Sequence, residues 1–100
     1  MFARRMKEAR TAAKLSQERL GVLAGIDEMS SSARMNQYER GKHEPDFSMV
    51  ERLAQVLNVP ESYFYTKDDN AAWMQVWFHR ASKEERERFL DSLRSGHTPE

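Results

Sequence analysis

The chain has 100 residues, of which 39% are hydrophobic, with a net charge of zero and no cysteine. A chain this short builds one modest core, so we expect one domain with a small appendage and neither disulfide bonds nor thiolate metal sites. The zero charge hides an asymmetry that favours one phosphate-facing side: residues 1–45 carry nine lysines and arginines against six acids, and residues 46–100 carry seven against ten.

Apolar residues recur at spacings of three and four along nearly the whole chain, and period-two alternation is missing, so the sequence predicts an all-α fold. A first helix is expected over residues 2–13, with Arg5 on its solvent side. Ser16 suits the N-cap of a second helix over residues 17–24, because its hydroxyl can accept a hydrogen bond from a backbone N–H of the first turn. Gly25 is expected to end this second helix.

A third helix is expected to end at Arg40, before Gly41. Three serines can each supply its N-cap: Ser30, Ser31 and Ser32.

Asp46 can cap a fourth helix over residues 47–57, where Phe47 is the first apolar residue expected to be buried. Pro60 suits the first turn of a short fifth helix over residues 60–65. These five helices are predicted to enclose one core.

Two further helices are expected over residues 71–81 and 82–95, packed as an antiparallel hairpin. The segment Ser82-Lys83-Glu84-Glu85 has the pattern of a capping box at the start of the second of them. We therefore divide the chain into a domain over residues 1–66 and a C-terminal hairpin over residues 67–100.

The C-terminal hairpin has more apolar surface than one packed face can bury, and large apolar patches seldom stay exposed on a monomer. We predict that it forms the interface of a homodimer; the alternative is that it only packs back onto the first and fifth helices. The predicted interface residues are Trp73, Trp77, Phe78, Phe89 and Leu93.

A glutamine at the start of the second predicted helix is followed by a glycine four residues later and by another glycine at the turn. An inward apolar pair lies beyond that turn, and the third helix ends in Tyr38-Glu39-Arg40-Gly41. With these residues the chain resembles, over roughly residues 3–65, the lambda-repressor-like helix-turn-helix family, the Cro/XRE class of transcriptional regulators. The resemblance implies a five-helix DNA-binding domain, followed here by a two-helix extension. The residues that carry it are Gln17, Gly21, Gly25, Met35 and Tyr38.

Packing gives a reason for part of this pattern. A side chain larger than that of Gly21 would push the second and third helices apart, and Gly25 permits the positive φ of the turn. Arg10 lies where members of the family carry an arginine that pairs with the glutamate matching Glu39. The resemblance therefore implies an ion pair that ties the first helix to the third.

The interval from Gly25 to Gly41 spans 16 positions, where the family pattern has about twelve. Aligned backward from Gly41, the usual helix cap falls on Ser31. The four extra residues, Asp27 to Ser30, lie either in the turn or in an added first turn of the helix. Acids at this point weaken DNA binding if they approach phosphate, or they interact favourably with the positive end of the helix dipole.

The third helix, over residues 31–40, is expected to enter the major groove of an operator. Its outward side chains suit base edges, since Asn and Gln can bond adenine and a small apolar group can touch the thymine methyl. The predicted base contacts are Ser32, Ala33, Asn36 and Gln37. The predicted phosphate contacts are Ser16, Gln17, Arg34, Arg40, Lys42 and His43.

We therefore predict a sequence-specific DNA-binding transcriptional regulator, of repressor type, with double-stranded DNA as its partner. The alternative is an antitoxin or adaptor that captures another protein through the C-terminal hairpin. An enzyme is not expected, because no nucleophile, base and orienting acid form a local motif and no glycine-rich phosphate loop occurs.

No cofactor or metal is expected, because the three histidines, His43, His79 and His97, are far apart in the sequence. No segment approaches the roughly 20 apolar residues that span a bilayer, so a soluble cytoplasmic protein is expected.

Overall fold

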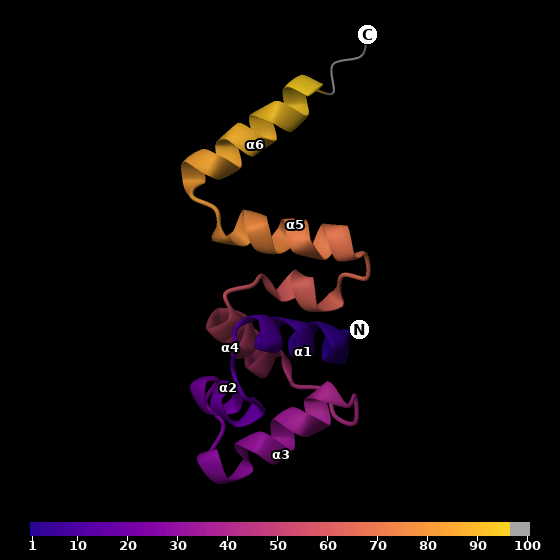
Figure 1. Cartoon of the computed structure of the whole chain (residues 1–100), viewed down its shortest axis with the longest axis vertical. Coiled ribbons are helices and arrows are strands. Elements are labelled where there is room, and N and C mark those ends of the chain that lie inside the picture. The colour runs from indigo at the N-terminus through magenta and orange to yellow at the C-terminus, as the bar shows by residue number, and fades with distance from the viewer. Residues whose placement is uncertain (97–100) are drawn as a thin grey trace.

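The computed structural model describes residues 1–96 of the chain, which form α-helices and one short 3₁₀ helix, without strands in this range. Residues 97–100, which include His97 and the end of the predicted C-terminal hairpin, lie outside the described residues. The elements in chain order are α1 (Phe2–Ala12), α2 (Gln17–Leu23), α3 (Glu28–Glu39), α4 (Phe47–Leu57), η1 (Glu61–Tyr65), α5 (Asp69–Arg80) and α6 (Lys83–Gly96) (Figure 1). The predicted all-α fold, five short helices followed by a two-helix extension, is confirmed.

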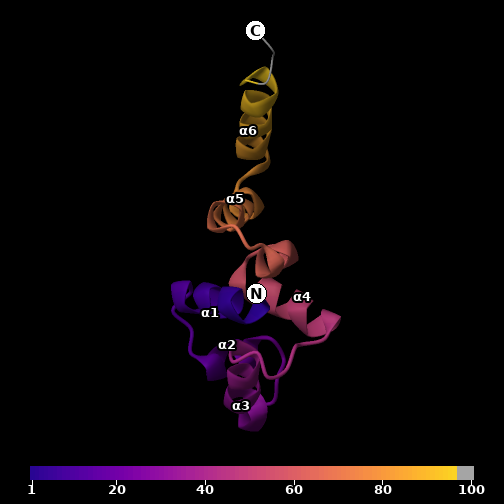
Figure 2. The same cartoon turned by 90° about the vertical axis from the view of Figure 1, so that its right-hand side faces the viewer.

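The molecule is elongated, with principal extents of 59 × 24 × 23 Å. Helix α3 lies at one end and α6 at the other, while α1, α4 and η1 occupy the middle (Figures 1 and 2). The element expected to contact DNA is thus far from the element expected to form the dimer.

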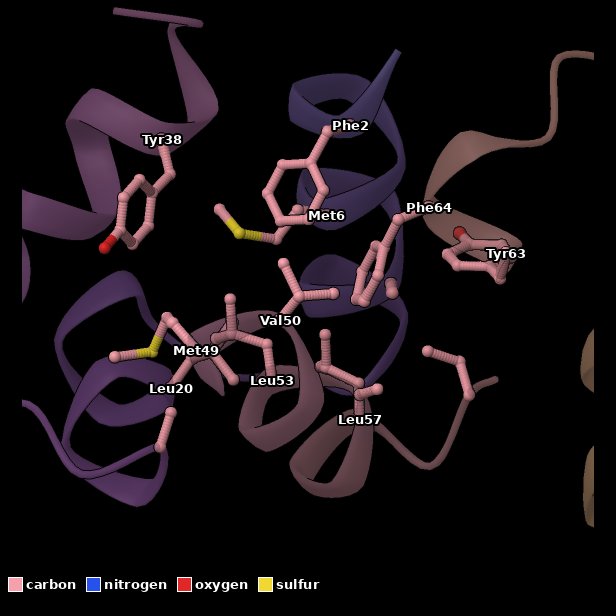
Figure 3. Packing of buried hydrophobic residues seen from close by; sticks show 14 of the residues in the cluster. Phe2, Met6, Leu20, Tyr38, Met49, Val50, Leu53, Leu57, Tyr63 and Phe64 are labelled. Carbon is pink, nitrogen blue, oxygen red and sulfur yellow. The ribbon is translucent and has the colours of Figure 1, made fainter. Parts of the chain in front are cut away.

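The hydrophobic core lies where α1, α2, α3, α4 and η1 meet (Figure 3). Helix α4 supplies its most regular apolar face, and Phe64 from η1 closes the core against Phe2, with ring centroids 4.9 Å apart. Phe47, expected inside, is 75% exposed, because the first turn of α4 projects beyond the helices around it (Figure 2). The remaining α4 residues of the core are Met49, Val50, Leu53, Ala54 and Leu57.

Local capping fixes the ends of several helices as the sequence predicts. The Ser16 hydroxyl accepts a hydrogen bond from the Arg19 N–H at 3.0 Å, at the start of α2. Asp46 caps α4 in the same way. Gly25, with φ of +96°, forms the turn after α2 in a backbone conformation that residues other than glycine rarely adopt.

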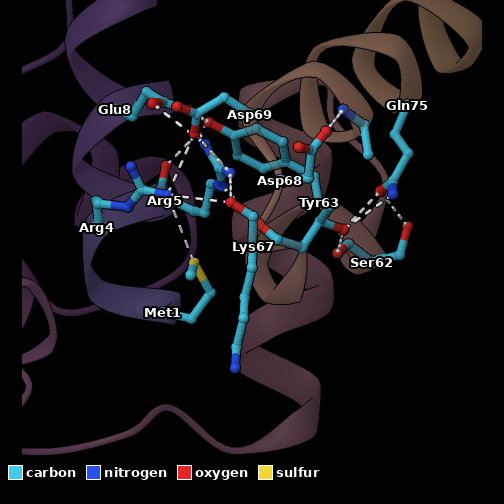
Figure 4. A network of polar contacts seen from close by, with 12 residues as sticks. Met1, Arg4, Arg5, Glu8, Ser62, Tyr63, Lys67, Asp68, Asp69 and Gln75 are labelled. Atoms are coloured by element: carbon cyan, nitrogen blue, oxygen red, sulfur yellow. Dashed lines mark hydrogen bonds and ion pairs between the residues drawn. The ribbon is translucent and has the colours of Figure 1, made fainter.

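Arg5 corrects the prediction for α1, since its side chain is only 1% exposed instead of facing solvent. Its guanidinium donates to the Thr66 carbonyl at 2.9 Å, to the Lys67 carbonyl at 2.9 Å and to Glu8 Oε1 at 3.0 Å, and it pairs with Asp69 Oδ1 at 3.0 Å (Figure 4). Because the fork of donors is satisfied, the charge can be buried. Arg5 therefore fastens α1 to the segment that joins η1 to α5.

The carboxyl of Asp69 belongs to the same cluster of polar contacts. Its pKa lies below the ordinary value, first because Arg5 donates a hydrogen bond to it and then because the charges of Arg4 and Arg5 are close. Its ionised form is therefore favoured in the folded protein.

Helices α5 and α6 form an open V, which corrects the expectation of a closely packed antiparallel hairpin (Figure 1). Their described contacts lie near the connection, where the Phe89 ring meets Trp77 at 5.2 Å and Phe78 at 6.4 Å. The physical reason is that α5 turns Ala72 and Val76 toward the main core, whereas α6 buries none of its residues.

The start of α6 follows the predicted capping box. The Ser82 N–H donates to Glu85 Oε1 at 2.8 Å, and the Glu85 N–H donates to the Ser82 hydroxyl at 3.1 Å. The backbone hydrogen bond from Ser82 lowers the pKa of the Glu85 carboxyl. Division of the chain after residue 66 places the boundary in the linker between η1 and α5 and stays a prediction.

Within residues 1–96, no helix combines the length and apolar character needed to cross a membrane. In the same range, no group of three or more histidine, aspartate and glutamate side chains is placed to hold a metal ion.

Candidate nucleic-acid interface

Helices α2 and α3 pack closely because residue 21 is a glycine. A β-carbon built on Gly21 would lie 2.0 Å from Ser31 Oγ and 2.9 Å from Met35 Cγ, both closer than atoms can approach. Ser31 lies buried between the two helices and donates a hydrogen bond to the Glu18 carbonyl at 2.7 Å. The predicted reason for this glycine is confirmed.

The start of α3 differs from the prediction of a serine-capped helix over residues 31–40. The helix begins at Glu28, and the Asp27 carboxylate caps it by accepting a hydrogen bond from the Met29 N–H at 3.0 Å. Ser31 cannot serve as the cap, because its hydroxyl is used between α2 and α3. The extra residues thus supply an added first turn, with both acids where the helix dipole favours negative charge.

The two sides of α3 have different surroundings. Met35 and Tyr38 are buried in the core, as expected, together with Ser31. The opposite side faces solvent at the end of the molecule (Figure 1). All four predicted base-contacting residues are exposed on it: Ser32, Ala33, Asn36 and Gln37.

A polar network holds α3 against α1 and α2. Arg10 binds the Glu39 carboxylate through two hydrogen bonds, one of them from Nη2 to Oε1 at 3.1 Å, and also donates to the Leu15 carbonyl at 2.8 Å. Gln17 Nε2 donates to Glu39 Oε1 at 3.0 Å and to Asn36 Oδ1 at 3.4 Å. The implied ion pair is present, and Gln17 connects it to a predicted base-contacting side chain.

The predicted phosphate-contacting residues fall into two groups. Ser16 and Gln17 stand at the start of α2. The basic residues of the second group, all exposed, lie on α3 and in the loop after it: Arg34, Arg40, Lys42 and His43.

A shallow hollow of about 230 Å³ brings part of the second group together with a predicted base contact. Its lining includes Arg34, Gln37 and His43, beside Tyr38 and the acid Glu44. Residues predicted separately for base and phosphate contact therefore share one surface.

Met29 is also exposed on α3, although the sequence pattern did not point to it. Its side chain is 93% exposed, at the second residue of α3. A third helix that begins after the serines leaves Met29 in the turn, which is why it was missed. Asp27 as an alternative N-cap was the signal that would have found it.

Comparison with known proteins identifies a family and similar proteins. The sequence profile of the helix-turn-helix domain matches residues 1–62. Uncharacterized HTH-type transcriptional regulators from Sinorhizobium medicae (strain WSM419) and Rhizobium meliloti (strain 1021) are each 34% identical over 61 residues, which are 61% of this chain and 41% of the relative. The chain thus spans less than half the length of these curated relatives.

A solved structure is similar over nearly the whole chain. The crystal structure of the transcriptional regulator BswR superposes with a TM-score of 0.88 and 40% sequence identity, and the match covers 95% of this chain and 94% of that chain. The similarity therefore includes the C-terminal helices as well as the matched domain.

Proposed function

Because the chain belongs to the helix-turn-helix domain family, we propose that it is a sequence-specific DNA-binding transcriptional regulator that inserts α3 into the major groove and acts as a repressor. The observation that carries the proposal is the exposed face of α3, which lies opposite the buried face and most of whose side chains are able to form hydrogen bonds. The similar proteins are named as transcriptional regulators, a class that is not enzymatic.

Base recognition in this proposal comes from the outward side of α3. Asn36 and Gln37 each have an amide donor and acceptor that complement the N7 acceptor and N6–H donor of adenine in the major groove, and Ala33 can touch a thymine methyl. Gln17 donates to Asn36 Oδ1, which leaves the amino group of Asn36 free to turn toward a base. Ser32 can bond either a base or a phosphate.

Phosphate contacts position the helix without selecting sequence. The exposed cations on α3 and in the loop after it flank the base-contacting face. The Ser16 hydroxyl accepts a hydrogen bond from the Arg19 N–H, and its own hydrogen can still be donated to a phosphate. A protein bound in this way covers promoter DNA and excludes other proteins from it. This steric effect is our reason for proposing repression.

Replacement of Gln37 by alanine is expected to reduce discrimination between the operator and an unrelated duplex by about 5- to 150-fold, the equivalent of roughly 1 to 3 kcal/mol for a bidentate base contact. Affinity for the unrelated duplex should stay the same, because the phosphate contacts remain. A duplex selected by the wild-type chain from a randomised pool serves as the operator, and gel-shift titration measures both affinities.

Gln55→Ala is the matched control, since it removes an exposed glutamine from α4. It should leave both affinities unchanged. Equal weakening on both duplexes by Gln37→Ala would show that Gln37 does not contact bases.

A homodimer through the V of α5 and α6 completes the proposal. One helix-turn-helix unit contacts only a few base pairs, whereas a two-fold dimer places two such units about one helical turn of DNA apart. The supporting observation is the apolar surface of the V, where Trp73 is 70% exposed and Leu93 is also exposed. A groove of about 480 Å³ is lined by residues of α5 and α6 together with Pro60 and Ser62.

Leu93→Asp is expected to convert a dimer into a monomer, because it places a charge in the proposed apolar interface. Sedimentation equilibrium of the full chain measures the change, with Leu23→Asp, at an exposed position of α2, as the control. A monomeric wild-type chain would contradict the homodimer. Co-purification of an unrelated protein that Trp77→Ala releases would favour the antitoxin or adaptor alternative.

A further inference from the structure

We propose that Met29 is an additional specificity-determining residue, whose side chain contacts a thymine methyl group in the operator outside the base pairs contacted by Asn36 and Gln37. This inference rests on the proposed function, in which α3 enters the major groove. It assigns to the added first turn of α3 a contact with DNA.

The spacing of residues on α3 carries the first step. Met29 precedes Ser32 and Ala33 by three and four residues, and it precedes Asn36 and Gln37 by seven and eight. Residues at these spacings lie on one side of an α-helix, because each residue turns the chain by about 100°. Met29 therefore continues the exposed base-contacting face by one turn toward the N-terminus of the helix.

The position of the added turn carries the second step. In helix-turn-helix proteins the N-terminal residues of the helix in the groove are those that contact base edges. Here the Asp27 cap fixes the start of the first turn, and the packing of Ser31 against Gly21 fixes its end, so the added turn is held in line with the rest of α3. It is the part of this helix nearest to its N-terminal end.

The chemistry of the side chain carries the third step. Met29 is 93% exposed, so it contributes almost nothing to the core. Its flexible, apolar end suits contact with another apolar group, and in the major groove that group is the thymine methyl. Glu28 lies one residue earlier, off this side of the helix, and its carboxylate would accept a hydrogen bond from cytosine instead.

The experiment compares thymine with deoxyuridine, which lacks only the methyl group. The wild-type chain first selects an operator from a randomised duplex pool, and Asn36→Ala and Gln37→Ala identify the base pairs that those two residues specify. Each operator thymine is then replaced in turn by deoxyuridine, and affinities are measured for the wild type, Met29→Ala and Met29→Leu.

At one thymine outside those base pairs, the wild type should lose roughly threefold to fivefold in affinity, the value of one buried methyl group. Met29→Leu should keep this sensitivity, because leucine is also apolar, and Met29→Ala should lose it. Circular dichroism should show both variants to be folded.

The inference is overturned if every thymine whose replacement weakens binding by the wild type also weakens binding by Met29→Ala. It is likewise overturned if no replacement weakens binding by the wild type. Failure of the proposed function gives a different result, because the wild-type chain then enriches no sequence from the pool, and the inference fails with it.

Discussion

Replacement of Arg10 by alanine is expected to lower the free energy of unfolding by about 3 to 5 kcal/mol, the range for breaking a buried ion pair from one side. The side chain of Glu39 is only 4% exposed, so without Arg10 its carboxylate keeps a single side-chain donor, Gln17. The Leu15 carbonyl loses its bond as well. Chemical denaturation followed by circular dichroism measures the change.

Lys7→Ala is the control for Arg10→Ala, because it removes an exposed cation from the same helix and should change stability by less than about 0.5 kcal/mol. The double variant Arg10→Met/Glu39→Met should be more stable than Arg10→Ala, since it leaves no buried charge. A loss below about 1 kcal/mol for Arg10→Ala would mean that the pair behaves as an exposed one.

Replacement of Gly21 by alanine should destabilise the protein by about 2 to 3 kcal/mol, at the upper part of the usual range for overpacking. The added β-carbon overlaps Ser31 and Met35, so α3 must shift away from α2. Affinity for the selected operator should fall along with stability, because the same shift moves the base-contacting face. Thermal and chemical denaturation test the first effect, and gel-shift titration tests the second.

Two further variants separate this clash from a general effect of alanine. Gly96→Ala, where nothing lies within 4 Å of the added carbon, should not destabilise the protein. Ser31→Gly in the Gly21→Ala background should restore part of the stability, because it removes the nearest overlapping atom. A Gly21→Ala protein as stable as the wild type would contradict the close packing of α2 on α3.

Several helix ends could be predicted because each depends on local chemistry. The Ser16 cap, the Gly25 turn and the Ser82–Glu85 capping box all involve residues close in sequence, and the structure confirms them. The tight crossing at Gly21 and the Arg10–Glu39 pair are also confirmed, although both required a family resemblance. The contacts of the exposed α3 face with DNA stay a prediction.

The predictions that were wrong concern features that depend on contacts between residues distant in the sequence. The sequence predicted a serine cap for α3 at Ser30, Ser31 or Ser32, but the cap is Asp27, and Ser31 is buried against α2. Arg5 has the helical spacing of the core face, but it was predicted to be exposed because it is charged. Its burial depends on hydrogen bonds to the carbonyls of residues 66 and 67, which are distant in the sequence. The opening between α5 and α6 likewise depends on how α5 packs against the main core, and local sequence patterns do not predict that packing.

The small buried area of α6 links the order of this helix to the abundance of the protein. Its described contacts include the capping box, the hydrogen bonds from Arg86 to the Phe78 and His79 carbonyls, and the Phe89 ring at the vertex, but none of its residues is buried. A second copy bound in the proposed dimer would therefore add to its stability. Under the proposed dimerisation, helix ordering and association share one equilibrium. Occupancy of a promoter would then rise with the square of the copy number at low abundance, so that a modest increase in expression turns a largely vacant operator into a largely filled one.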